Sequence, residues 1–207
     1  MDAQAFWNVI GNYNQQTIMA QIGLFLFIVL TIVLSYMQTI KWAAKFGLGI
    51  VNLFIGFGFF ALYGTEPIQK YFALPLYILS GFLLLYESWH NRNDILEKPS
   101  YFQCLLLLLY LIYPLISMLL GNHFPQMVTH IMPCPVVSLS IAIYAGYKRK
   151  NKLLLALLTV WGYPSSSLCI FTYSSLCSSL LCLLSTLSSV TFFIASLLLS
   201  IIFHYMF

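Results

Sequence analysis

Charged side chains are scarce in this sequence. Only 7% of the residues are Asp, Glu, Lys or Arg, whereas soluble domains have about 25%. Hydrophobic residues make up 61% of the chain and aromatic residues 17%. A soluble protein with so few charges could not cover its surface with polar groups. The composition therefore excludes a soluble globular protein and predicts a chain whose solvent is a lipid bilayer.

Motifs of catalysis and ligand binding are also missing. The sequence has no HExxH, P-loop, GxGxxG or Ser-His-Asp pattern, and no acidic cluster suited to Mg²⁺. Its five cysteines form no CxxC pair, which argues against a metal or disulfide framework. We expect no enzyme activity, no cofactor and no metal. The net charge of +4 comes from few residues, so we also expect no nucleic-acid partner.

The N-terminal region lacks positive charge, since no Lys or Arg precedes Lys41. A cleaved signal peptide begins with a positive segment, so we expect the first apolar stretch to be retained as a helix. Residues 1–17 mix aromatic and polar side chains. They fit either a short interfacial helix with an aromatic anchor or a plain polar lead-in.

Long apolar runs dominate the remainder. Candidate spans cover residues 18–40, 47–63, 71–86 and 101–120, and a fifth ends at Tyr147. The last 55 residues are long enough for two more, at about 20 residues each. This pattern predicts one all-α membrane domain over residues 1–207, a polytopic bundle of six or seven transmembrane helices.

Positive charges favour alternate loops, which indicates an orientation. Only Lys70 falls in the N-terminal segment or the even-numbered loops. The positive-inside rule then places the odd-numbered loops in the cytoplasm and the N-terminus on the outer side of a cell inner membrane. Eight bases lie in the odd-numbered loops: Lys41, Lys45, Arg92, Lys98, Lys148, Arg149, Lys150 and Lys152.

The tail, residues 163–207, is rich in Ser, Leu and Cys. Serine can bond its hydroxyl to a carbonyl one turn back, so a Ser-rich helix can persist in lipid. Two readings stay open: a small-residue packing face, or a change of reading frame near Tyr163.

The fifth span is interrupted by HFPQMVTHIMPCPVVS, residues 123–138. Pro133 and Pro135 should stop a helix from entering and hold Cys134 extended, so a new helix is expected just after Pro135. Its twelve residues to Tyr147 cover about 18 Å, against a hydrocarbon core of about 30 Å. Non-helical backbone at that depth must be buried in protein or line a wet cavity.

Broken helices often build solute sites near the bilayer midplane, and this is our leading reading. A structural kink with a scaffold or partner-binding role is the alternative. A thiol enzyme at Cys134 activated by His130 is a third reading. Pro133 removes the helical spacing between His130 and Cys134 that a metal site would use. The candidate solute-site or helix-break residues are His123, Pro125, His130, Pro133, Cys134 and Pro135.

Other buried polar residues have structural readings. Glu87 ends the third span, where it is expected to reach water at the cytoplasmic interface. Gln21 and Asn52 are expected to bond neighbouring helices.

The region YPLISMLLGNHFPQMVTHIMPCP resembles the signature of a bacterial multi-pass membrane family catalogued as domain of unknown function 6064. Tyr113-Pro114, Gly121, Phe124-Pro125, Thr129 and Pro133-Cys134-Pro135 carry the likeness, which covers roughly residues 4–162 and fades beyond Gly162. The sequence departs from the family pattern at Asn122 and Val136-Val137. The resemblance implies an inner-membrane protein with no established activity.

Overall fold

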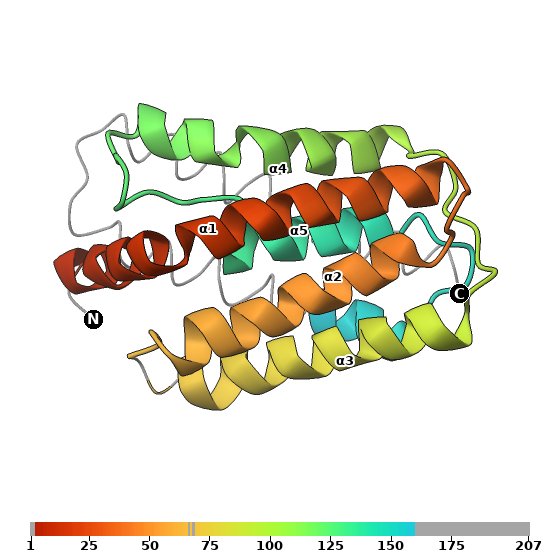
Figure 1. The fold of residues 1–207 in the computed structure, drawn as a ribbon, viewed down its shortest axis with the longest axis horizontal. Helices are drawn as coiled ribbons and strands as arrows, with labels where there is room; N and C mark the ends of the chain where they lie inside the picture. The colour runs from red at the N-terminus through yellow and green to blue at the C-terminus, as the bar shows by residue number, and fades with distance from the viewer. Residues whose placement is uncertain (1–2, 66, 68, 160–207) are drawn as a thin grey trace.

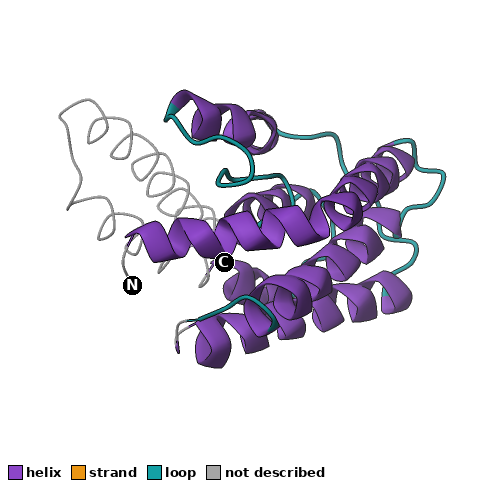
Figure 2. Ribbon diagram, turned by 60° about the vertical axis from the view of Figure 1, so that its left-hand side comes forward, coloured by secondary structure: helices purple, strands orange, loops and turns teal. Residues whose placement is uncertain are grey.

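The described part of the chain is entirely helical. A computed structural model describes residues 3–65, 67 and 69–159 (Figures 1 and 2). In these residues no strand forms, and a further helical stretch covers residues 152–159. The elements are α1 (Ala3–Tyr36), α2 (Ala43–Phe54), the π-helices η1 (Ile55–Ala61) and η2 (Gln69–Ala73), α3 (Leu74–His90), α4 (Tyr101–Leu119) and α5 (Pro133–Tyr144).

Helix α5 forms the centre of the bundle. It packs against α4 and α2, while α2 also packs against α1 and α3. Every residue of α5 except Cys134 is buried. Two glycines let α2 and α3 approach closely: a Cβ on Gly49 would lie 3.1 Å from the Gly81 carbonyl oxygen, and the converse distance is also 3.1 Å. Small residues of this kind allow close helix packing in lipid.

Three helical stretches are long and apolar enough to cross a membrane: Trp7–Tyr36, Ala43–Ala61 and Gln69–His90. Two shorter apolar helices, Gln103–Leu119 and Pro133–Tyr144, accompany them. Helix α1 also exposes large apolar side chains at helical spacing, among them Met19, Ile22, Leu26 and Leu30. An exposed apolar stripe of this length marks a surface that meets lipid or other protein.

Several predicted boundaries change. Residues 3–17 are neither a separate interfacial helix nor a lead-in, because α1 runs unbroken from Ala3 to Tyr36. Several of its polar side chains have partners elsewhere in the fold, among them Asn8, Asn14 and Gln16. Helix α2 begins before residue 47, and η2 with α3 extends beyond 71–86 at both ends. The Ser-rich tail and the count of six or seven spans rest on residues outside those described.

Helix α5 also begins earlier than predicted. It starts at Pro133 rather than after Pro135, and Cys134 is helical rather than extended. Proline is tolerated in the first turn of a helix, where backbone N–H groups have no intrahelical partner. The helix ends at Tyr144 instead of Tyr147. Residues 121–132 contain no helix, as predicted for the stretch before Pro133, and they form the connection from α4 to α5.

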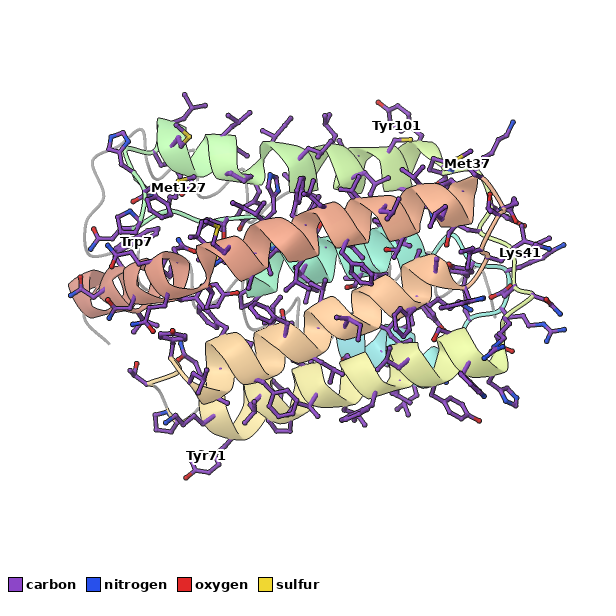
Figure 3. The ribbon with its side chains drawn as sticks, in the orientation of Figure 1. Trp7, Met37, Lys41, Tyr71, Tyr101 and Met127 are labelled. Atoms are coloured by element: carbon purple, nitrogen blue, oxygen red, sulfur yellow. The ribbon has the colours of Figure 1, made fainter. Side chains whose placement is uncertain are left out.

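The three basic loops gather at one end of the bundle, where Lys41, Met37 and Tyr101 are labelled in Figure 3. An isolated β-bridge joins Leu96 to Tyr147 and so links the α3–α4 loop to the segment after α5. The Gln38 side chain donates to the Leu96 carbonyl at 2.9 Å and brings in the α1–α2 loop. Trp7 and Met127 lie at the opposite end.

Candidate functional site

The connection from α4 to α5 is a non-helical segment that we call the break segment, residues 121–132. Gly121 has φ of +86°, a left-handed conformation that glycine adopts at no steric cost, and it follows the end of α4. The peptide bond between Phe124 and Pro125 is cis. From there the chain runs beside α1 into α5 (Figure 1). The segment therefore supplies a run of backbone groups that no helix satisfies.

Side chains of α1 and α3 bind the carbonyls of this segment. Asn14 Nδ2 donates to the carbonyls of Pro125 at 2.7 Å and Met127 at 2.8 Å. The Tyr13 hydroxyl donates to the carbonyl of Ile131 at 2.8 Å. Both α1 side chains are fully buried. Because buried backbone groups must find partners, these bonds allow the irregular chain to pack against α1.

A second set of bonds surrounds Thr129. Its hydroxyl donates to Gln21 Oε1 at 2.7 Å, and Gln21 Nε2 donates to Asn14 Oδ1 at 3.1 Å. Tyr77 of α3 donates to the Pro133 carbonyl at 2.7 Å, at the start of α5. Gln21 was expected to bond a neighbouring helix. Its partners instead include Thr129 of the break segment and Asn14 of its own helix. Asn52 follows its prediction, donating to Ser140 Oγ of α5 at 3.1 Å.

The residues predicted as a site differ in burial, and three of them lie together in the first turn of α5. Pro133 and Pro135 are buried in the first turn of α5, while Cys134 is partly exposed. Pro125 is partly buried. The two histidines lie in different surroundings, because His123 is exposed whereas His130 packs among aromatic rings. In the described residues, no three His, Cys, Asp or Glu side chains form a set that could hold a metal.

The ring of His130 lies between α1 and α4. Its ring stacks on Phe25 of α1, with 4.7 Å between ring centroids, and lies 5.1 Å from the ring of Tyr110 of α4. His130 Nδ1 and Tyr110 Oη are buried, and neither has a hydrogen-bond partner among the described residues. Buried polar atoms in native proteins usually bond to protein, water or ligand. Two orphan polar atoms on neighbouring rings therefore indicate a place for a further hydrogen-bonding group.

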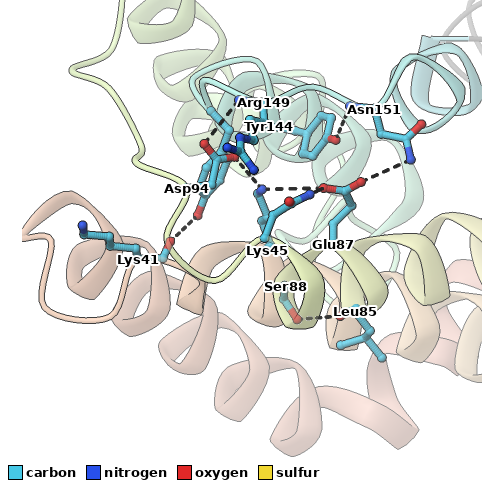
Figure 4. A network of polar contacts seen from close by, with 11 residues as sticks. Lys41, Lys45, Leu85, Glu87, Ser88, Asp94, Tyr144, Arg149 and Asn151 are labelled. Atoms are coloured by element: carbon cyan, nitrogen blue, oxygen red, sulfur yellow. Dashed lines mark hydrogen bonds and ion pairs between the residues drawn. The ribbon is translucent and has the colours of Figure 1, made fainter.

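A second polar centre lies at the basic end of the bundle. Lys45, in the first turn of α2, is fully buried. Its Nζ lies 2.8 Å from Asp94 Oδ2 and 3.8 Å from Glu87 Oε2 (Figure 4). The ring centroid of Tyr147 is 4.2 Å from the same Nζ. Buried ammonium groups need such charge pairing to offset desolvation. We call Lys45, Glu87 and Asp94 the buried ion cluster.

Loop groups complete the hydrogen bonding of the two carboxylates. Asn91 Nδ2 donates to Glu87 Oε2 at 2.7 Å, and Asn151 Nδ2 donates to Glu87 Oε1 at 3.2 Å. The backbone N–H of Arg149 donates to Asp94 Oδ1 at 3.2 Å. The cluster therefore holds the α3–α4 loop and the segment after α5 against the ends of α2 and α3.

Tyr147 packs against Lys45 of the cluster and also contacts the α1–α2 loop. Its hydroxyl donates to the carbonyl of Lys41 in the α1–α2 loop at 2.9 Å. Burial raises the pKa of Tyr147 to about 12, with the nearby Asp94 carboxylate as a smaller contribution. The phenol thus keeps the proton that this bond requires.

The comparisons place the chain in a family. Its sequence matches the model described as Family of unknown function (DUF6064) over residues 3–202. The chain is a DUF6064 protein. The match confirms the resemblance seen in the sequence and runs past Gly162, where the likeness was expected to fade, so most of the Ser-rich tail belongs to the DUF6064 region. No curated protein and no solved structure matches the chain significantly.

Sequence reasoning missed the buried ion cluster of this DUF6064 chain. Lys45 was assigned to a loop and Glu87 to a water-exposed interface, and both assignments are wrong because the two side chains are buried together. Lys45 and Asp94 are 49 residues apart, so no local pattern joins them. One signal was present: three of the five acidic residues fall within residues 87–97, in a chain where charge is rare.

Proposed function

We propose that this DUF6064 protein is a multi-pass inner-membrane protein that binds or passes a small polar solute at the broken fifth helix. The observation that carries the proposal is the pair of buried, unpartnered polar atoms beside the break, Tyr110 Oη and His130 Nδ1. The three helical stretches able to cross a membrane support the membrane part of it.

The chemistry of the break favours a neutral solute. A buried hydrogen-bonding atom without a partner costs about 1–3 kcal/mol. A small molecule that both donates and accepts hydrogen bonds would remove this cost at Tyr110 and His130 together. Phe25 provides an apolar wall, and the neighbouring Thr129 and Gln21 are uncharged.

The proposed topology has six or seven spans. The basic loops lie in the cytoplasm, and the N-terminus and the start of the break segment lie on the outer side. The gathering of the three basic loops at one end supports this arrangement. Helix α5 has twelve residues, or about 18 Å, so the break would be reached from the outer side.

A second candidate is a non-transporting scaffold that binds a partner protein. It is favoured by the complete bonding of four carbonyls, those of Pro125, Met127, Ile131 and Pro133, to side chains of α1 and α3. A break secured in this way can serve as a fixed structural element.

Thiol labelling separates the two candidates. Cys134 is kept and the other four cysteines are replaced by serine. Intact cells are then treated with a membrane-impermeant thiol reagent, with and without urea or glycerol as neutral probe solutes. We expect Cys134 to react from the outside and at least one probe to slow the reaction. In a matched Tyr110→Phe variant, the reaction should persist and the slowing should disappear.

Two results would overturn the solute site. An absence of labelling in cells and in opened membranes would show a packed kink and favour the scaffold. Labelling that neither probe alters would show an exposed turn without a solute site.

A further inference from the structure

We propose that the basic end of the bundle is a docking surface for the headgroups of anionic phospholipids. The first observation is that the fold buries most acidic side chains of this end and leaves most basic ones exposed. Glu87 and Asp94 are buried with Lys45, which removes two acids from the surface and only one base. Glu97 is the exposed acid that remains among the described residues of this end. The exposed bases are Arg92, Lys98, Lys148, Arg149 and Lys152.

Exposed aromatic side chains place this surface at the membrane interface. Trp89 at the end of α3 is 75% exposed, and Tyr101 at the start of α4 is 91% exposed. Trp and Tyr are enriched at the level of lipid headgroups, where one part of the ring meets hydrocarbon and another meets water. The Arg92 guanidinium lies 4.0 Å from the ring centroid of Trp89. A positive charge is thereby held at the height where lipid phosphates lie.

The backbone that carries the bases is ordered. Besides the bridge between Leu96 and Tyr147, the N–H of Glu97 donates to the Gly146 carbonyl at 3.0 Å. The N–H of Arg149 is bound to Asp94 of the buried ion cluster. Lys98 and Lys148 are thus presented by two segments that are fixed to each other. Such preorganisation lowers the entropic cost of binding, and each base near an anionic surface strengthens binding about fivefold.

The proposal relies on the membrane location proposed above and not on the solute site, and its test separates the two. The full chain, with Trp89 as its only tryptophan, is reconstituted in bilayers containing brominated phosphatidylcholine or brominated phosphatidylglycerol. Quenching by the brominated phosphatidylcholine reports insertion. The ratio of quenching between the two lipids gives their relative binding constant. We expect phosphatidylglycerol to bind at least fivefold more strongly at low salt, with the preference falling as salt is added.

Variants assign the preference to particular side chains. Lys98→Gln/Lys148→Gln/Arg149→Gln should lower the ratio several-fold, while Arg92 and Lys152 keep their charges. It leaves the backbone bond of Arg149 in place. Lys98→Arg/Lys148→Arg keeps the charges and should retain the preference. Lys70→Gln, at the opposite end, should also retain it. A ratio of one in the parent chain, or an unchanged ratio in the triple variant, would overturn the proposal.

Discussion

Replacing Lys45 with methionine tests the buried ion cluster most directly. Methionine keeps an unbranched stem for packing and removes the ammonium group. The side chains of Lys45, Asp94 and Glu87 are 0%, 3% and 7% exposed. The carboxylates therefore cannot turn toward water unless helices or loops move. The substitution leaves two buried negative charges without their cation.

The geometry sets the expected loss of stability. Breaking a buried ion pair by removing one partner costs about 3–5 kcal/mol, and we expect Lys45→Met to lower the free energy of unfolding by this amount. Most of the loss should come from Asp94, because it makes the 2.8 Å contact, whereas Glu87 keeps the amides of Asn91 and Asn151. Adding Asp94→Asn should therefore recover part of the loss.

The measurement is reversible unfolding of the purified chain in mixed micelles, followed by far-UV circular dichroism as denaturing detergent is added. Lys41→Met is the matched control, because Lys41 lies on the same end but is partly exposed, and its effect should stay within about 0.5 kcal/mol. If Lys45→Met changed the free energy of unfolding by less than about 1 kcal/mol, or if Asp94→Asn gave no recovery, the cluster would not stabilise the fold as argued.

The same unfolding measurement checks three further predictions. Gly81→Ala should destabilise the chain by about 1–3 kcal/mol, because the new Cβ would lie 2.7 Å from Leu53 Cγ; Gly23→Ala, with open space around it, should be neutral or stabilising, and equal effects would refute the packing argument. Asn14→Ala should lower the free energy of unfolding by about 1–3 kcal/mol or more, because two carbonyls of the break segment lose their donor. A neutral result would mean that water replaces the amide. Ser100→Ala should lower the free energy of unfolding by about 0.5–2 kcal/mol, because it removes the capping box of α4. Unchanged stability and unchanged helicity would contradict that role.

The helical architecture and the position of the break were predictable from local chemistry. An apolar chain in lipid must satisfy its backbone internally, so long hydrophobic runs become helices. Pro125, Pro133 and Pro135 lack N–H donors and exclude a continuous helix through residues 121–132. The candidate span over residues 101–120 matches the start of α4 at Tyr101, where Ser100 and Gln103 form a capping box. The exact start of α5 was missed because proline is as compatible with a first helical turn as with a loop.

The sequence by itself therefore determined the apolar class, the helices and the interruption, because these depend on residue type and on neighbours within a few positions. Only the tertiary structure decided which polar groups meet. Asn14 reaches carbonyls more than a hundred residues away. Tyr110 Oη and His130 Nδ1 are buried without hydrogen-bond partners among the described residues. Lys45, predicted in a loop, pairs with Asp94 inside the bundle. Such pairings follow from how helices pack, since burial makes an unpaired polar group costly but does not specify which distant group will satisfy it.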